Sequence, residues 1–89
     1  MIEKDITVTN RLGLHARASA RLVQVLQRFK SETWLISNGR EVNAKSIMGV
    51  MMLAAGMGAR LTLRVDGEDE ESALAAAVEL FQNNFDEGG

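Results

Sequence analysis

The chain has 89 residues, a formal net charge of −2 and 46% hydrophobic residues. This length supports one small hydrophobic core, so we expect a single domain over residues 1–89. Cysteine is absent, which excludes disulfides, thiolate metal sites and cysteine nucleophiles. An isoelectric point near 5.3 argues against a nucleic-acid-binding protein.

The sequence also lacks the signals of export and of membrane insertion. Residues 1–5 have no cationic stretch leading into an apolar run, so we expect no signal peptide. The longest apolar stretch, residues 47–55, is too short to span a membrane and is interrupted by Gly49. We therefore expect a cytoplasmic protein without membrane insertion, and a monomer by default.

The first half of the chain predicts a strand, a helix and a β-hairpin, in that order. Apolar residues alternate over residues 2–9, which is typical of a strand with one buried face. From Ala16 to about Lys30 they recur every three or four residues, which predicts a helix. Asn38-Gly39 then signals a two-residue hairpin turn. The strands on either side of this turn are expected over residues 33–37 and 40–44.

The second half predicts a short helix, a strand and a final helix. Ser46 is a suitable N-cap for the short helix, which we expect to stop near Gly56. Residues 60–65 alternate as a strand, and residues 72–85 carry an apolar stripe at helical spacing. We expect residues 86–89 to form a frayed tail.

The order of these elements, β-α-β-β-α-β-α, predicts the α+β class. Apolar faces on strands and helices must be buried against each other in layers. We expect an open-faced β-sandwich, in which three helices cover one face of a four-stranded antiparallel sheet. The other face of such a sheet is in contact with solvent.

Basic residues are concentrated around the first predicted helix. Between Ile6 and Ser31 the chain has five basic residues and no acidic one, although acidic residues outnumber basic ones overall. Helix starts usually carry acidic residues, because the free N–H groups and the macrodipole favour negative charge. The amides of this helix start, Arg17 and the neighbouring His15 therefore resemble an anion site. A solvated basic face is the common alternative, but its coincidence with a histidine favours the anion site.

His15 is the only histidine and the candidate for covalent chemistry. No nucleophile elbow accompanies it, so the base of a serine triad is a poor interpretation. One histidine without cysteines does not make a zinc site, and we expect neither a metal nor another cofactor. An imidazole that itself acts as the nucleophile remains, and neutral imidazole is abundant near neutral pH.

Two segments carry a resemblance to a known family: NRLGLHARA at residues 10–18 and VNAKSIMGVM at residues 42–51. They resemble the active-site segment and the regulatory-serine region of the HPr family, the histidine-containing phosphocarriers of the phosphoenolpyruvate–sugar phosphotransferase system. The spacing of the segments, the chain length and the order of elements are also similar to that family. The resemblance therefore covers essentially the whole chain.

This resemblance implies a phosphocarrier that is covalently modified rather than an enzyme. His15 would accept a phosphoryl group from enzyme I, with phosphoenolpyruvate as the original donor, and pass it to IIA components of sugar permeases. On the family's pattern the group is bonded to Nδ1 of His15. Arg17 and the backbone N–H groups of Ala16, Arg17 and Ala18 would stabilise it.

The resemblance also implies a regulatory site and a docking surface. Ser46 would be the target of an HPr kinase/phosphorylase, in addition to capping its helix. The short helix has more apolar residues than one buried face requires, and flexible methionines suit a surface that meets several partners. The residues expected to dock enzyme I and IIA proteins are Ala20, Arg21, Gln24, Ile47, Met48 and Met51.

Ala18 departs from the family's pattern, which usually has proline at this position. Proline in a first helical turn restricts φ and removes an N–H group that has no partner in any case. Alanine restores that donor and loosens the start of the helix. The departure suits a paralogue with specialised partners, such as the nitrogen-related branch of the system. A regulatory binding module of that branch, acting mainly by protein contacts, is the alternative function.

Overall fold

The computed structural model describes residues 1–87 and contains a four-stranded antiparallel sheet. The strands are β1 (Ile2–Thr7), β2 (Glu32–Ser37), β3 (Arg40–Asn43) and β4 (Arg60–Asp66). Their order across the sheet is β1-β4-β2-β3, and each neighbouring pair is antiparallel. Leu63 of β4 pairs with Lys4 of β1 on one side and with Leu35 of β2 on the other.

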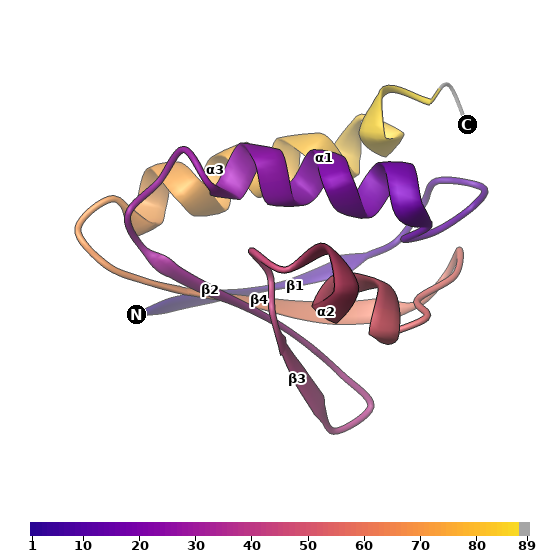
Figure 1. The fold of residues 1–89 in the computed structure, drawn as a ribbon, viewed down its shortest axis with the longest axis horizontal. Helices are drawn as coiled ribbons and strands as arrows, with labels where there is room; N and C mark the ends of the chain where they lie inside the picture. Colours follow the sequence, from indigo (N-terminus) through magenta and orange to yellow (C-terminus); the bar gives the residue numbers. More distant parts are fainter. Residues whose placement is uncertain (88–89) are drawn as a thin grey trace.

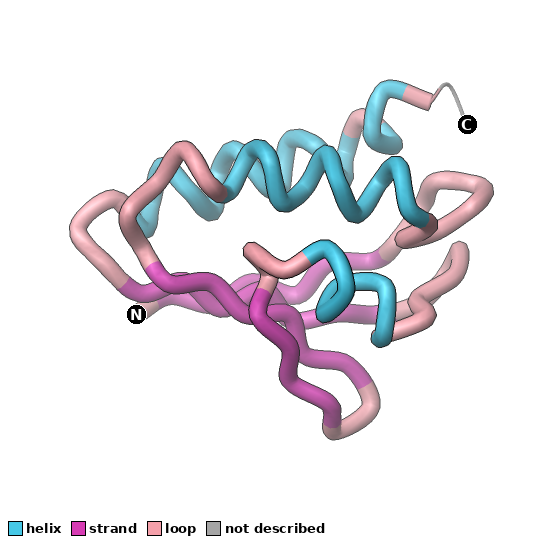
Figure 2. Tube along the Cα trace, in the orientation of Figure 1, coloured by secondary structure: helices cyan, strands magenta, loops and turns pink. Residues whose placement is uncertain are grey.

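Helices cover one face of this sheet. They are α1 (Ala16–Leu26), α2 (Ile47–Met52) and α3 (Glu70–Gln82), followed by a short 3-10 helix, η1 (Asn84–Asp86). Helices α1 and α3 lie side by side above the sheet, and α2 lies close to α1 and β3 (Figures 1 and 2). The predicted α+β class, the open-faced sandwich and the β-α-β-β-α-β-α order are confirmed.

The core lies between the sheet and the helices, where the alternation of the strands directs their apolar side chains. In β4, Leu61, Leu63 and Val65 are buried against the helices. The residues between them lie on the other face, where the Arg64 guanidinium binds Glu3 and Glu41 at 2.7 Å each. One strand thus divides an apolar core from a charged surface by its period of two.

Helix α1 ends at Leu26, four residues before the predicted end near Lys30. The amide of Arg28 bonds to the carbonyl of Val25, and the amide of Phe29 bonds to that of Leu26. These bonds reach back three residues instead of four, so the last turn tightens and the α-helix stops.

Two other predicted ends were also too long. Strand β1 stops at Thr7 instead of residue 9, although Val8 is still fully buried. Helix α2 stops at Met52, before Gly56, because the chain reverses at Ala54, where φ is +50°. A left-handed residue cannot continue a right-handed helix.

The final helix is shifted and divided relative to its predicted range of 72–85. It begins at Glu70 and ends at Gln82, and Phe85 belongs to η1. Asn84, Phe85 and Asp86 all have positive φ, between 52° and 61°. Asparagine and aspartate tolerate this conformation, but at Phe85 it costs about 1–2 kcal/mol. The burial of Phe85, whose ring packs edge-on against Phe81 with centroids 4.9 Å apart, offsets part of this cost.

The predicted frayed tail over residues 86–89 is therefore wrong for Asp86 and Glu87. Asp86 is part of η1, and Glu87 makes hydrogen bonds to side chains near the start of α1. The rest of the predicted tail, residues 88–89, lies outside the described residues. Burial of Phe85 keeps the chain packed up to this point, which a composition of small and acidic residues does not reveal.

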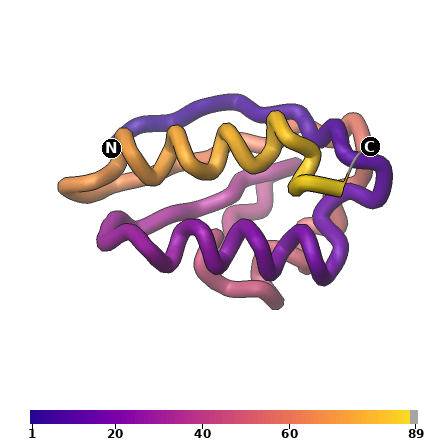
Figure 3. The backbone as a smooth tube through the Cα atoms, turned by 90° about the horizontal axis from the view of Figure 1, so that it is seen from above, coloured from indigo at the N-terminus to yellow at the C-terminus, as the bar shows by residue number. Residues whose placement is uncertain are grey.

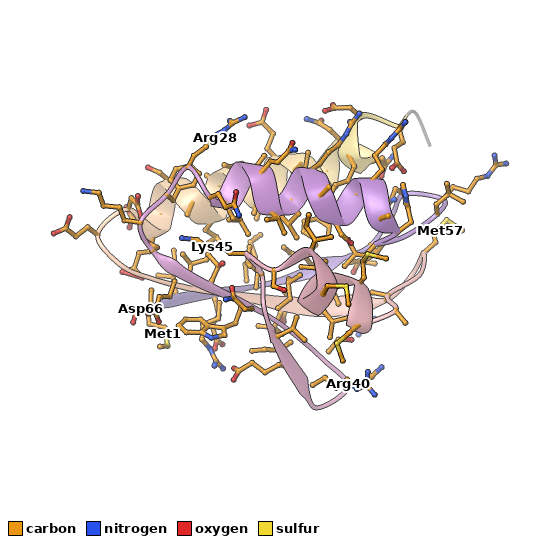
Figure 4. All side chains as sticks on the ribbon, in the orientation of Figure 1. Met1, Arg28, Arg40, Lys45, Met57 and Asp66 are labelled. Atoms are coloured by element: carbon orange, nitrogen blue, oxygen red, sulfur yellow. The ribbon has the colours of Figure 1, made fainter. Side chains whose placement is uncertain are left out.

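The amino terminus is anchored to the start of α3. The Met1 ammonium lies 2.7 Å from Glu70 and 3.4 Å from Asp66, beside which it is drawn in Figure 4. The hydrogen bond to Glu70 raises the pKa of this ammonium above its ordinary value.

In the described part of the chain, no helix is both long and apolar enough to cross a membrane.

Candidate functional site

His15 occupies the N-cap position of α1. Its backbone is extended, with φ −72° and ψ −179°, and its carbonyl accepts the first helical hydrogen bond from Ser19 at 2.9 Å. Its side chain makes no capping bond and is 28% exposed. The backbone thus begins the helix while the imidazole ring remains available for other contacts.

The loop before His15 is held against the loop that follows α2. The amide of Leu14 donates to the carbonyl of Ala55 at 2.8 Å. Gly13 has φ +64°, and a Cβ atom there would lie 2.3 Å from the same carbonyl oxygen. Only glycine combines this φ with so close an approach. Gly13 therefore permits the loop packing that places His15 at the start of the helix.

The first turn of α1 presents hydrogen-bond donors without local acidic residues. It has no Asp or Glu, as predicted. Within residues 1–87, no backbone acceptor is found for the amides of Ala16, Arg17 and Ala18. Arg17 is exposed and makes no side-chain hydrogen bond or ion pair to another residue in that range. These donors and the positive end of the helix dipole favour an anion beside His15.

A carboxylate that the sequence did not predict faces the His15 ring. Glu87 Oε2 lies 2.5 Å from His15 Nε2, and the two residues are 72 positions apart in sequence. Asn10 Nδ2 donates both to the other Glu87 oxygen, at 3.0 Å, and to the carbonyl of Gly13, at 2.8 Å. The acid-free stretch around α1 therefore does not make an acid-free site, because the C-terminal segment brings an acid from outside it.

The contacts of Glu87 keep it ionised. Burial opposes the charge of its carboxyl group, but hydrogen bonds from Asn10 and His15 and the nearby Arg21 outweigh this effect. Together they hold the pKa of Glu87 below its ordinary value. At neutral pH the His15 ring thus faces a carboxylate that can only accept a hydrogen bond.

Arg21, which was predicted to dock partners, holds this C-terminal segment in place. Its Nη1 donates to the carbonyl of Phe85 and lies 3.6 Å from Asp86 Oδ2. Thr9 adds a hydrogen bond of 2.6 Å to the side chain of Asn84. Figure 3 shows that the end of α3 and the following residues lie next to the start of α1. The packing of antiparallel α1 and α3 thus brings residues around the start of α1 together with the residues that follow α3 in one site.

Glu87 belongs to no local motif, and Asn10 begins the segment at residues 10–18 without any signal of its contact with a distant carboxylate. Glu87 lies in a short acidic stretch at the C-terminus, and Asn10 lies between a strand and a turn, where asparagine is common. The one signal nearby is Phe85, since a large aromatic residue near the chain end indicates that the chain is still packed there.

The other predicted site residues lie on α2 and α1. Ser46 caps α2, with its Oγ accepting the amide of Gly49 at 3.0 Å, so the predicted N-cap is confirmed. Ile47, Met48 and Met51 are exposed, Met48 by as much as 72%. On α1, Gln24 is exposed and Ala20 is half-buried. Most apolar side chains of α2 are therefore exposed, and only Val50 is buried in the core.

No metal site is found in the part of the chain that the structure describes. Among residues 1–87, no three His, Asp or Glu side chains are grouped so that they could hold a metal ion. The groups that the structure does bring together are the imidazole, the carboxylate beside it, and the amide and guanidinium donors around the start of α1.

Comparisons with known proteins agree on one family. The family model described as the PTS HPr component phosphorylation site matches residues 2–83. The phosphocarrier protein HPr of Xylella fastidiosa strain Temecula1 is 60% identical over 87 residues, covering 98% of each chain.

Solved structures give the same result. A crystal structure of HPr from Thermoanaerobacter tengcongensis has a TM-score of 0.95 and 42% identity, and covers 98% of each chain. Crh of Bacillus subtilis was crystallised as a dimer with a swapped domain. Its TM-score is 0.76 and its identity 42%, over 94% of this chain and 97% of its own.

Proposed function

This chain belongs to the HPr family and is a phosphoryl carrier of the phosphotransferase system, and we propose that it carries the phosphoryl group on His15. The family match favours this function over a module that acts mainly by protein contacts. The observation that supports His15 most directly is the contact between its Nε2 and the Glu87 carboxylate. With the proton on Nε2, the lone pair of a neutral ring lies on Nδ1, which is the nucleophilic atom.

The start of α1 supplies the stabilisation that a phosphoryl group on Nδ1 requires. The amides of Ala16, Arg17 and Ala18 and the positive end of the helix dipole favour its negative charge. The Arg17 guanidinium can form two parallel hydrogen bonds to phosphoryl oxygens. A carrier must also release the group, and an exposed Arg17 can follow the phosphoryl group into a partner's site instead of locking it in place.

The partners are enzyme I, as donor, and IIA components of sugar permeases, as acceptors. The outward-facing Ile47, Met48 and Met51 provide an apolar surface on α2, which packs against the helix that His15 begins. Ala20, Arg21 and Gln24 extend that surface along α1. Flexible methionines can adapt to more than one partner, which suits a protein that meets both a donor and several acceptors.

Mass spectrometry tests the modified residue. The protein is incubated with enzyme I and phosphoenolpyruvate, and its intact mass is measured before and after acid treatment. We expect one acid-labile phosphoryl adduct on the wild type and none on His15→Ala. Ser46→Ala is the matched control and should keep the adduct, because it leaves His15 intact. A phosphoserine would differ from this adduct, since it would survive the acid treatment. An adduct that persists in His15→Ala excludes His15 as the carrier residue.

Ser46 is proposed as a second, regulatory site for a kinase that uses ATP. Its hydroxyl is at the start of α2, where a phosphate would add negative charge next to the apolar docking surface. Phosphorylation there is expected to weaken the binding of partners that present acidic residues. Incubation with purified HPr kinase/phosphorylase and ATP should modify the wild type but not Ser46→Ala. Equal modification of both proteins would remove this proposal.

We also propose that the chain acts as a monomer. Strand β1 pairs with β4 of the same chain along its full length, so no strand has to be supplied by a second copy. Light scattering at micromolar concentration should give the mass of one chain. A dimer mass would instead indicate an exchange of elements of the kind seen in Crh.

A further inference from the structure

The C-terminal segment brings a carboxylate to the nitrogen of His15 that is opposite the proposed nucleophile. Glu87 Oε2 and His15 Nε2 are 2.5 Å apart, and their side chains are only 14% and 28% exposed. Because an ionised carboxylate has no proton to donate, the ring nitrogen that faces it must carry one. The neutral ring is thereby restricted to the tautomer in which Nδ1 has the lone pair.

Asn10 holds this carboxylate from the other side. The Asn10 side chain is 1% exposed, and its Nδ2 donates to both Glu87 Oε1 and the carbonyl of Gly13. Both partners are acceptors, so only the NH2 group of the amide can face them. Its Oδ1 is buried and has no partner within residues 1–87. The two bonds of the amide nitrogen thus fix Glu87 Oε1 relative to the loop that precedes His15.

The backbone that carries Glu87 is held in a strained conformation. Asn84, Phe85 and Asp86 have positive φ in succession, and such strain persists only where surrounding contacts maintain it. Those contacts are the buried Phe85 ring and the hydrogen bond from Arg21 to its carbonyl. Glu87 is thus delivered to His15 by a braced segment, and strain of this kind is typical of functional sites.

We propose that Glu87 is a positioning residue for phosphoryl transfer, with a carboxylate that keeps the proton of His15 on Nε2 and the lone pair on Nδ1. Asn10 orients Glu87 for this purpose. The inference rests on the proposed function, in which Nδ1 of His15 takes up the phosphoryl group. It adds that a residue 72 positions away decides which ring nitrogen can react.

The transfer step gives the carboxylate a second effect. The Nδ1 lone pair forms the bond to phosphorus, while the bond from phosphorus to the donor's leaving atom breaks and that atom keeps the electron pair. No proton has to move, since the ring keeps its proton on Nε2 and acquires a positive charge. Glu87 faces that charge directly, as the aspartate of a serine-hydrolase triad faces its imidazolium.

The same proton assists the return step. When an acceptor attacks phosphorus, the bond to Nδ1 breaks and its electron pair returns to the ring. With the proton still on Nε2, His15 leaves as neutral imidazole. Without that proton it would leave as an imidazolate anion, which is a far poorer leaving group. Glu87 therefore serves both the uptake and the release of the group.

Glu87→Gln is the most informative variant, because it preserves size and shape but changes the hydrogen-bond pattern. Both oxygens of Glu87 face donors, one on Asn10 and one on His15. A glutamine has one oxygen and one NH2 group, so it can satisfy only one of them. If its oxygen stays with Asn10, its NH2 group turns to His15 and favours the opposite tautomer. Asp86→Asn is the matched control, since it removes the same charge one residue away, near Arg21.

The first measurement uses the unphosphorylated protein and needs no partner. The ¹⁵N chemical shifts of the His15 ring, recorded at a pH where the ring is neutral, report which nitrogen carries the proton. We expect the Nε2–H tautomer in the wild type and in Asp86→Asn. Glu87→Gln should shift the majority to the Nδ1–H tautomer, and Glu87→Ala should lose the wild-type preference. An unchanged tautomer in both Glu87 variants overturns the proposal, whatever their transfer rates.

The second measurement compares transfer rates and the pH dependence of hydrolysis. Phosphoryl uptake from phosphorylated enzyme I should be at least ten-fold slower in Glu87→Gln, and Glu87→Asp should restore part of the rate. Spontaneous hydrolysis of the phosphorylated protein should rise at a lower pH in Glu87→Gln than in the wild type. An equal loss in Asp86→Asn would assign the effect to net charge and overturn the proposal. By contrast, the absence of an acid-labile adduct on the wild type contradicts the proposed function itself. The tautomer measurement does not depend on that result, because it uses the unphosphorylated protein.

Discussion

The starts of α1 and α3 both lie beside a carboxylate, yet the two carboxylates have different tasks. At α3, Asp69 accepts the backbone amides of Lys30 and Ser31 at 2.8 and 2.9 Å and the Ser31 hydroxyl at 2.5 Å. It thereby closes the turn between α1 and β2. At α1, no acidic residue lies in the first turn, and the carboxylate comes from Glu87, at the far end of the chain.

This difference separates a structural helix start from one that suits a ligand. The acids at α3 are local in sequence and already hold other parts of the protein, Glu70 by binding the Met1 ammonium. The carboxylate at α1 bonds to the imidazole of His15 and not to the helix amides. A helix start that lacks its own acids can keep its amides for an anion, even when a carboxylate is close by. Substitutions at the two starts should therefore affect different properties.

Arg17→Ala at the start of α1 should have the largest effect, and on transfer alone. Loss of a charge-assisted hydrogen bond to the phosphoryl group corresponds to about 10–100-fold slower uptake. Because Arg17 is exposed, the free energy of unfolding should change by less than about 0.5 kcal/mol. Quenched-flow measurement with phosphorylated enzyme I and a urea melt give the two quantities. A destabilised variant with a normal rate would make Arg17 a structural residue.

Asp69→Asn at the start of α3 should show the opposite pattern. Hydrogen bonds from the Ser31 hydroxyl and the Lys30 amide lower the pKa of Asp69 from 3.8 to about 2. A carboxylate with a lower pKa in the folded state stabilises the protein fully above its unfolded value. This contribution disappears as the pH falls from 3.8 towards 2. Urea melts should thus separate wild type and Asp69→Asn at pH 7 and bring them together near pH 2.

The phosphoryl uptake rate of Asp69→Asn should equal that of the wild type at neutral pH, since Asp69 contacts the turn after α1 and not its start. A slower rate at full folding would mean that the two helix starts are coupled. A stability difference that persists at pH 2 would mean that the carboxylate charge is not the cause.

Ser46→Ala tests a third helix start, which is capped by its own side chain. Loss of the hydrogen bond to the Gly49 amide should lower the free energy of unfolding by about 1 kcal/mol. Uptake on His15 should be unchanged, because the substitution leaves the docking side chains in place. Ser46→Thr keeps a capping oxygen and should recover most of the stability, as measured by thermal melts.

Ala18→Pro should have the smallest effect and a stabilising sign. No backbone acceptor is found for the Ala18 amide within residues 1–87, so proline removes no bond there. Restricting the unfolded chain should add about 0.5–1 kcal/mol. Uptake should continue, because the amides of Ala16 and Arg17 remain. A clear loss of stability in urea would instead show that a proline ring does not fit at this position, where Ala18 is fully buried.

Features carried by short segments could be predicted from the sequence. The strands follow from alternation, the Ser46 cap from one residue type before an apolar run, and the absence of acids at the first helix from counting. Helix ends were less well predicted. Helix α1 ends in a tight turn after Leu26, and α2 is followed by Ala54 in the left-handed conformation. Neither end is marked by a glycine or a proline, the residues that most clearly signal the end of a helix.

Local patterns in the sequence are sufficient to predict the fold class, the position of His15 at a helix start and the shortage of local negative charge there. These properties depend on periodicity, propensity and composition within a few residues. The contact at His15 Nε2 follows instead from the three-dimensional packing and, on our proposal, so does the ring nitrogen that bears the proton. That contact depends on Glu87, Asn10 and Arg21, which meet because α1 and α3 pack antiparallel over the sheet and the buried Phe85 holds the chain end against them. Contacts between residues so distant in sequence follow from the packing of the whole domain, and no local pattern encodes them.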